Sequence, residues 1–161
     1  MDGYQRDGET KAERLDRNWN ELLQELRVTQ TGIQILTGFL LTLPIQPAFR
    51  DLSGFERNAY VVAISASILA TCLLITPVAM HRGLFRQRRK ETLVSVAHHV
   101  SVIGLATMAA AVVSVMAFTF SLVLGEGAGI AAATIGALLF VAAWVVLPLG
   151  LRRHLSRSKG P

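Results

Sequence analysis

The chain has 161 residues, of which 52% are hydrophobic and 17% charged, and its net charge is +5. That composition is too apolar for an ordinary soluble domain, so it excludes the soluble globular classes. Its single cysteine, Cys72, excludes a disulfide within the chain and is expected to behave as a small hydrophobic residue.

Four stretches contain no Asp, Glu, Lys or Arg, and each reaches the roughly 18 residues needed to cross a bilayer. These stretches are 28–49, 59–80, 94–124 and 129–151. We therefore predict an all-α integral membrane protein, a four-helix bundle over 28–151. The first apolar stretch begins only at Val28, behind a charged segment and without a small-residue cleavage site after it. It is therefore expected to stay as a span rather than to be a signal peptide.

Residues 1–8 have two glycines and no apolar periodicity, which predicts a mobile tail. Residues 9–27 are predicted to form a cytoplasmic amphipathic helix that continues without a break into the first span. Its apolar stripe needs either the bilayer surface or a second protein helix to cover it. The candidate partner or lipid face of this helix comprises Leu15, Trp19, Leu22 and Leu26.

A line of polar and small residues runs beside that stripe and enters the membrane with the helix. An unpaired side-chain amide in hydrocarbon costs roughly 1 to 3 kcal/mol, so Thr31 and Gln34 are expected to face other helices. We predict that the bundle encloses the Gln34 amide. The line comprises Asn20, Gln24, Arg27, Thr31, Gln34 and Gly38.

Prolines and a capping pattern mark the connection to the second span. Pro44 and Pro47 are expected to end or kink the first helix. Ser53, with Glu56 three residues later, is a candidate cap for the second helix. That helix has a face of small residues through which helices approach closely, ending at a proline and a histidine. The face comprises Ala59, Ala63, Ala66, Ala70, Pro77 and His81.

The third and fourth spans show comparable faces. We expect the third span to pack through Ser95, His99, Ala106, Ala110, Ser114, Ala117 and Ser121. For the fourth span we expect Gly129, Ala133, Gly136 and Ala143, after a tight turn formed by GEGAG. All four predicted spans thus have one face suited to contact between helices.

The positive charge is concentrated on alternate connections. Fourteen of the sixteen Lys and Arg residues precede Val28, lie between His81 and Leu93, or follow Leu151. This distribution predicts that both termini, including the basic tail 152–161, are cytoplasmic. The densest basic run is expected to lie against anionic lipid, through Arg86, Arg88, Arg89 and Lys90. No aromatic residue alternates with these four, and no nucleic-acid-binding module is recognisable, so no nucleic-acid partner is expected.

A few polar residues near the cytoplasmic side of the spans remain to be explained. Thr31, Gln34, His81 and His99 form a candidate polar packing layer, in which His81 or His99 reaches the first helix. His98 is expected to point elsewhere. His98 and His99 point about 100° apart on a helix, so one metal ion cannot easily use both. We expect no metal, no cofactor and no enzyme activity, because nucleophile-elbow, phosphate-loop and paired-carboxylate patterns are also missing.

Two segments resemble a family of small bacterial four-span membrane proteins known only as a domain of unknown function. They are RLDRNWNELLQELRVTQTGIQILTGFLLTLP, which is the specific part, and TPVAMHRGLFR. The resemblance covers roughly 13–151. It implies a helical bundle in the plasma (inner) membrane and carries over no catalytic or binding residue.

Two functions are compatible with these features. The first is a non-enzymatic module that self-associates or binds a membrane-protein partner through its cytoplasmic helix. The alternative is an oligomeric small-solute or ion transport protein, in which the polar layer lines a passage. The polar layer itself is either a hydrogen-bonded contact that fixes helix register or part of that passage.

Overall fold

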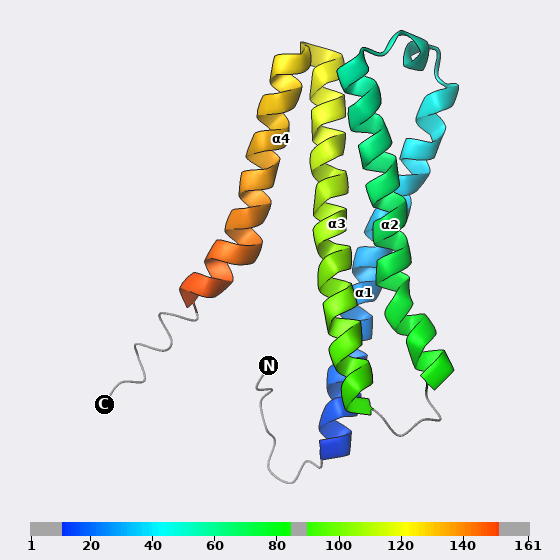
Figure 1. Cartoon of the computed structure of the whole chain (residues 1–161), viewed down its shortest axis with the longest axis vertical. Coiled ribbons are helices and arrows are strands. Elements are labelled where there is room, and N and C mark those ends of the chain that lie inside the picture. The colour runs from blue at the N-terminus through cyan, green and yellow to red at the C-terminus, as the bar shows by residue number, and fades with distance from the viewer. Residues whose placement is uncertain (1–10, 85–89, 152–161) are drawn as a thin grey trace. The chain divides into compact units, whose positions relative to one another are not determined.

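The computed structural model describes residues 11–84 and 90–151, and every regular element within these ranges is helical (Figure 1). The elements are α1 (Lys11–Thr42), the 3₁₀ turns η1 (Leu43–Ile45) and η2 (Pro47–Asp51), α2 (Gly54–Leu84), α3 (Lys90–Leu124), α4 (Glu126–Val141) and the π turn η3 (Ala142–Val146). Helix continues from η3 to residue 151. The side chains of 11–12, 14–16, 18–20, 22, 81–84 and 90–95 lie outside the described part.

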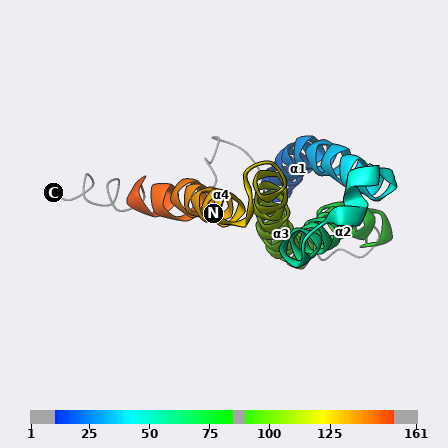
Figure 2. The same ribbon diagram turned by 90° about the horizontal axis from the view of Figure 1, so that it is seen from above.

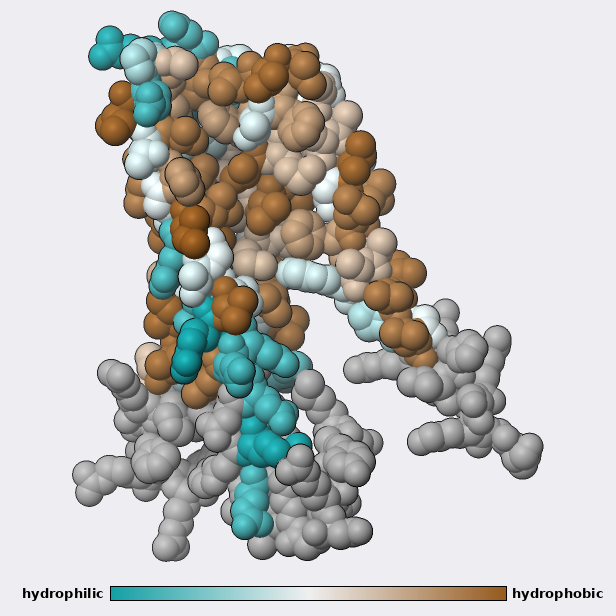
Figure 3. All heavy atoms as spheres, turned by 180° about the vertical axis from the view of Figure 1, so that it is seen from behind, coloured by the Kyte–Doolittle hydropathy of each residue, from teal (hydrophilic) through white to brown (hydrophobic). Residues whose placement is uncertain are grey.

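Four helices are long and apolar enough to cross a membrane, which makes the chain a membrane protein. The candidate spans are Leu23–Ile45, Gly54–Met80, Val96–Leu124 and Glu126–Leu151. In Figure 3 the surface of the described residues is mostly hydrophobic. Hydrophilic residues gather at the N-terminal part of α1 and at the connection formed by the 3₁₀ turns. The predicted class is confirmed: an all-α, four-span bundle whose first span continues an N-terminal helix.

The ends of the helices follow the sequence signals. Helix α1 ends at Thr42, and the two 3₁₀ turns that follow contain Pro44 and Pro47 near their starts. The Ser53 N–H donates to Glu56 Oε2 at 2.8 Å, and the Glu56 N–H donates to Ser53 Oγ at 3.2 Å. This reciprocal pair is a capping box, so the predicted cap of the second helix is confirmed.

Residue contacts divide the chain into two compact units. The first unit comprises Met1–Phe39 and Ser67–Met108, and the second comprises Leu40–Ala66 and Ala109–Pro161. The first unit therefore contains most of α1, the C-terminal part of α2 and the N-terminal part of α3. The second contains the other parts of α2 and α3 together with α4, and in it α3 lies between α2 and α4 (Figures 1 and 2).

The first unit has a core of apolar and small side chains. Ile33 of α1 and Leu74 of α2 are almost completely buried. A Cβ at Gly104 of α3 would stand 2.9 Å from Leu74 Cδ2, so a glycine at this position lets α3 approach α2 closely. The other buried members are Leu26, Ser67, Ala70, Pro77, Ala97 and Ser101.

The second unit is held by an aromatic cluster and by backbone contacts. Tyr60 of α2 lies between Phe49 of η2 and Phe118 of α3, at ring-centroid distances of 4.7 and 6.0 Å. Helix α4 meets α3 through glycines: a Cβ at Gly129 would stand 2.6 Å from the Ala117 carbonyl oxygen, and one at Gly136 would stand 2.7 Å from Met116 Sδ. At Gly129 the backbones of α3 and α4 thus come closer than any larger residue allows, whereas at Gly136 α4 packs against the Met116 side chain.

The predicted packing faces are partly right. In α2, Ala63, Ala66, Ala70 and Pro77 are buried and Ala59 is half-buried, which confirms that face as far as its side chains are described. In α4, Gly129 and Gly136 are buried as expected, but Ala133 is only half-buried and Ala143 is exposed.

The predicted face of α3 is correct at Ala117 and Ser121 but wrong nearer the N-terminal end. There His99, Ala106 and Ala110 are exposed, whereas Ala97, Ser101 and Gly104 are buried. The physical reason is that this part of α3 has small residues on two faces, and either face allows the backbone of a neighbouring helix to come close.

Candidate functional site

Helix α1 carries two parallel lines of residues, an inward line that is buried or half-buried and an outward line that is exposed. The inward line combines apolar residues with two polar ones at alternating steps of three and four, which is the spacing of a helix-packing seam. It comprises Leu23, Leu26, Gln30, Ile33, Thr37 and Leu40, all of them buried or half-buried. The outward line, Arg27, Thr31, Gln34 and Gly38, is exposed throughout. Each residue of the outward line follows a residue of the inward line, so the two lines are about 100° apart around the helix axis.

Gln30 makes the polar contact that joins α1 to α2 in the first unit. Its Nε2 donates to the Leu74 carbonyl oxygen at 2.6 Å. Leu74 lies three residues before Pro77, which interrupts the hydrogen bonds of α2 because proline has no N–H. The carbonyl left without its helical donor is that of Leu73, and Gln30 bonds to the next carbonyl in the same disturbed turn. In membranes, backbone groups near a helical proline are commonly bonded by a neighbouring helix.

Gln34 is exposed, so the prediction that the bundle encloses its amide is wrong. Thr31 is exposed as well, and its hydroxyl donates to the Arg27 carbonyl oxygen of its own helix at 3.0 Å. The reason is that Gln30, rather than Gln34, lies on the inward line with Leu26 and Ile33. The seven-residue spacing of Leu26, Ile33 and Leu40 is the signal in the sequence that identifies this line.

Of the two histidines in the predicted polar layer, His81 and His99, only His99 has a described side chain. His98 and His99 are both exposed on α3, and their rings contact each other edge to face at a centroid distance of 5.9 Å. The side chain of His81 lies outside the described residues. Within the described residues, no group of three His, Cys, Asp or Glu side chains is placed to hold a metal ion.

The predicted partner or lipid face of the N-terminal helix is described only at one end. Leu26 is 3% exposed and belongs to the core of the first unit, so its assignment to an external face is wrong. The side chains of Leu15, Trp19 and Leu22 lie outside the described part. The same holds for the basic connection, since Arg86, Arg88 and Arg89 are not described and Lys90 is described only as the first residue of α3.

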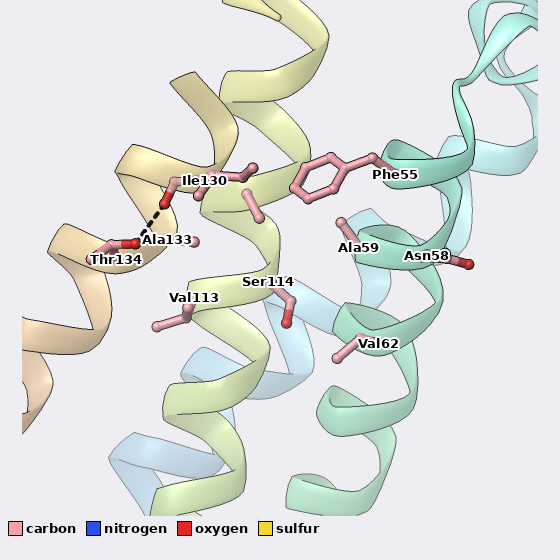
Figure 4. Close-up of a pocket in the computed structure, with 10 residues that line it drawn as sticks. Phe55, Asn58, Ala59, Val62, Val113, Ser114, Ile130, Ala133 and Thr134 are labelled. Carbon is pink, nitrogen blue, oxygen red and sulfur yellow. Dashed lines mark hydrogen bonds between the residues drawn. The ribbon is translucent and has the colours of Figure 1, made fainter. Parts of the chain in front are cut away.

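The second unit contains an open groove of 330 Å³ between α2 and α4, with α3 as its floor (Figure 4). In Figure 4 the Phe55 ring extends from α2 into the groove, whereas the Asn58 amide points away from it. The two hydroxyls in the lining bond to their own helices: Ser114 to the Ala110 carbonyl at 2.9 Å and Thr134 to the Ile130 carbonyl at 2.8 Å. The groove therefore presents an apolar surface.

Two polar contacts tie the ends of helices together in the second unit. The buried Tyr60 hydroxyl donates to the Leu40 carbonyl oxygen at 3.0 Å, which fixes the last turn of α1 against α2. Ser121 of α3 donates to Glu56 Oε1 at 3.4 Å, so the carboxylate that caps α2 also contacts α3. The first contact satisfies a carbonyl in the last turn of α1, where backbone carbonyls lack partners within the helix, and the second joins two side chains.

Comparison with known proteins adds a family. No curated protein and no solved structure matches the chain. A family model, described as a family of unknown function (DUF6328), matches residues 8–148. That match includes all four spans except the last three residues of the fourth. The chain, with its four candidate spans, is therefore a member of the DUF6328 family, a family of unknown function.

Proposed function

We propose that this protein is a non-enzymatic multi-pass membrane protein that acts by associating with another membrane-spanning chain. One observation carries the proposal: the Gln34 side chain is exposed in the middle of the span Leu23–Ile45 and has no hydrogen-bond partner among the described residues. Polar side chains in a membrane normally face other helices rather than lipid.

The neighbouring polar residues show how unusual Gln34 is. Five polar side chains lie between Thr29 and Thr37, and the other four are hydrogen bonded within the chain. Hydrocarbon offers no donor or acceptor, so an unpaired amide there costs about 1 to 3 kcal/mol. A partner helix that bonds to Gln34 removes this cost, and association is therefore favoured.

The apolar groove of the second unit supports the non-enzymatic part of the proposal. None of the described residues that line it is an acid, a base or a thiol. Its serine and threonine hydroxyls are already bonded to backbone carbonyls. Such a surface suits lipid chains or apolar side chains better than chemistry.

The association is expected to be measurable as the mass of the particle extracted with its native lipid. Wild-type protein should appear as a particle with more than one chain, and Gln34→Leu should shift it toward the single chain because leucine needs no polar partner in hydrocarbon. A wild-type particle that contains one chain at all protein-to-lipid ratios would contradict the proposal.

We further infer that the protein lies in the plasma (inner) membrane of a bacterial cell with both termini in the cytoplasm. The charge distribution, with fourteen of sixteen basic residues on alternate connections, supports this orientation. The resemblance to a family of small bacterial membrane proteins supports the location. Reporter fusions test the orientation. A reporter after Gly127 should be active only outside the cytoplasm, and one after Lys159 only inside it. The opposite pattern would reverse the assignment.

An oligomeric transport protein is the second candidate, and the same exposed line on α1 favours it. Several copies that turned Thr31 and Gln34 toward a common axis would line a passage with polar groups. His99, exposed on α3, also stays a candidate for such a lining. Solute or ion flux in liposomes, lost in Gln34→Leu, would support transport. Association without flux would contradict transport and would support only the binding function.

A further inference from the structure

We propose that the partner of α1 is α1 of a second copy, and that the two helices meet at Gln34 and Gly38 about a two-fold axis along the membrane normal. This inference rests on the proposed function and specifies the partner. The contact surface is the outward line of α1, with Gln34 at its centre and Gly38 one turn further along.

The direction of the helices follows from insertion. Copies of one membrane protein enter the membrane in one orientation, so their α1 helices run parallel to each other. A two-fold axis along the membrane normal then places each residue of the outward line opposite the same residue of the other copy. Gln34 therefore faces Gln34 at the same depth in the membrane.

A side-chain amide is suited to such a pairing. It carries two N–H donors and a carbonyl acceptor, so two glutamines can exchange a reciprocal pair of hydrogen bonds. A carboxylate or an ammonium group at this position would instead meet its own charge. Among the described residues nothing competes for the Gln34 amide, whereas the Gln30 amide is held by the Leu74 carbonyl oxygen at 2.6 Å.

Gly38 allows the two helices to come close. Apart from its own helix, no heavy atom lies within 4 Å of the place where a Cβ would stand, so this side of α1 is open. Small residues at helix contacts let membrane helices approach closely enough for side chains to bond across the interface. Arg27, two turns before Gln34, is exposed near the start of the span, and its long side chain can extend to the headgroups rather than meet its copy.

Cysteine crosslinking in membranes tests the geometry, in full-length protein with Cys72 replaced by alanine. Leu41→Cys extends the outward line by one turn and leaves Gln34 and Gly38 intact. Phe39→Cys is the matched control, because Leu41 and Phe39 are 60% and 69% exposed but point about 160° apart on the helix. We expect Leu41→Cys to form disulfide-linked dimers and Phe39→Cys to form few.

Gln34→Leu in the Leu41→Cys background should weaken dimerisation by about tenfold, the effect of one or two interhelical hydrogen bonds in a membrane. Gln34→Asn should recover part of the loss because it keeps the amide. Since Gln34 lies outside the core, the unfolding midpoint in detergent should stay unchanged, which shows that the variants fold.

The outcomes separate this inference from the proposed function. A wild-type protein that stays a single chain, with lipid alone against α1, overturns both. Dimers that crosslink through Phe39→Cys, or that Gln34→Leu does not weaken, overturn the inference while association stands. Products that join Leu41→Cys only to a different protein also overturn the second copy as partner.

Discussion

The contact of α1 with α2 and the contact of α3 with α4 hold two helices together in different ways. In the first unit a side-chain amide, Gln30 Nε2, bonds to the Leu74 carbonyl oxygen beside a proline. In the second unit Gly129 brings the backbones of α3 and α4 together and Gly136 makes room for the Met116 side chain, without any side-chain hydrogen bond between these helices among the described residues. In lipid there is no hydrophobic driving force for helix association, so packing and polar contacts must hold the helices together.

The two contacts should respond differently to change. The glycine contact depends on the absence of a side chain, and the neighbours of Gly129 are backbone atoms of Ala117 and Ser121 and the Ser121 Cβ, none of which can turn away. The amide contact depends on one hydrogen bond, and the side chain that makes it is only half-buried. A substitution that adds one carbon should therefore harm the second unit more than the loss of the amide harms the first.

The largest effect is expected for Gly129→Ala. The new Cβ would stand 2.6 Å from the Ala117 carbonyl oxygen and 2.8 Å from Ser121 Cβ, so α4 must shift away from α3. Overpacking of this kind costs about 1 to 3 kcal/mol in the free energy of unfolding. Unfolding in mixed micelles of increasing SDS content measures it.

Gly127→Ala is the matched control, because nothing lies within 4 Å of its Cβ position and alanine favours a helix. It should leave the free energy of unfolding unchanged or slightly higher. Equal losses for both variants would show that the helix backbone, rather than the contact with α3, decides the result.

A smaller effect is expected for Gln30→Leu. The variant removes the hydrogen bond to the Leu74 carbonyl oxygen, and interhelical polar contacts in membranes contribute about 0.6 to 2 kcal/mol to the free energy of unfolding. Gln34→Leu, four residues away on the same helix, should not lower this free energy in the monomer, since Gln34 is exposed. A larger loss for Gln34→Leu than for Gln30→Leu would reverse the assignment of the two lines.

The difference between Gln30 and Gln34 also marks how far the sequence predicts this fold. The four spans, the proline end of α1 and the capping box at Ser53 follow from local signals, and the structure has them. The polarity of its residues does not predict which side of α1 is buried. The cost of an unpaired amide predicts that Gln34 turns inward, but the described residues offer a hydrogen-bond partner to only one of the two glutamines. That partner is a carbonyl more than forty residues away in the sequence.

For a related reason, the sequence alone does not decide which face of α3 packs against α2. The lines through Ala97, Ser101 and Gly104 and through His99, Ala106 and Ala110 are both rich in small residues, so local sequence allows either to pack. The choice depends on Leu74, which fills the space left by Gly104. A prediction from one sequence cannot weigh that contact, because it depends on the relative position of two helices.

The smallest effect is expected for Ser121→Ala. This variant tests whether a polar contact at a helix end contributes as much to the free energy of unfolding as one inside the membrane. The Ser121 hydroxyl donates to Glu56 Oε1 at 3.4 Å, a long hydrogen bond, and Glu56 keeps its bond to the Ser53 N–H through the other oxygen. The loss should therefore be about 0.5 kcal/mol or less in the free energy of unfolding. Ser114→Ala is the control, since that hydroxyl bonds only to a carbonyl of its own helix. A loss for Ser121→Ala as large as that for Gln30→Leu would mean that membrane depth does not set the strength of these contacts.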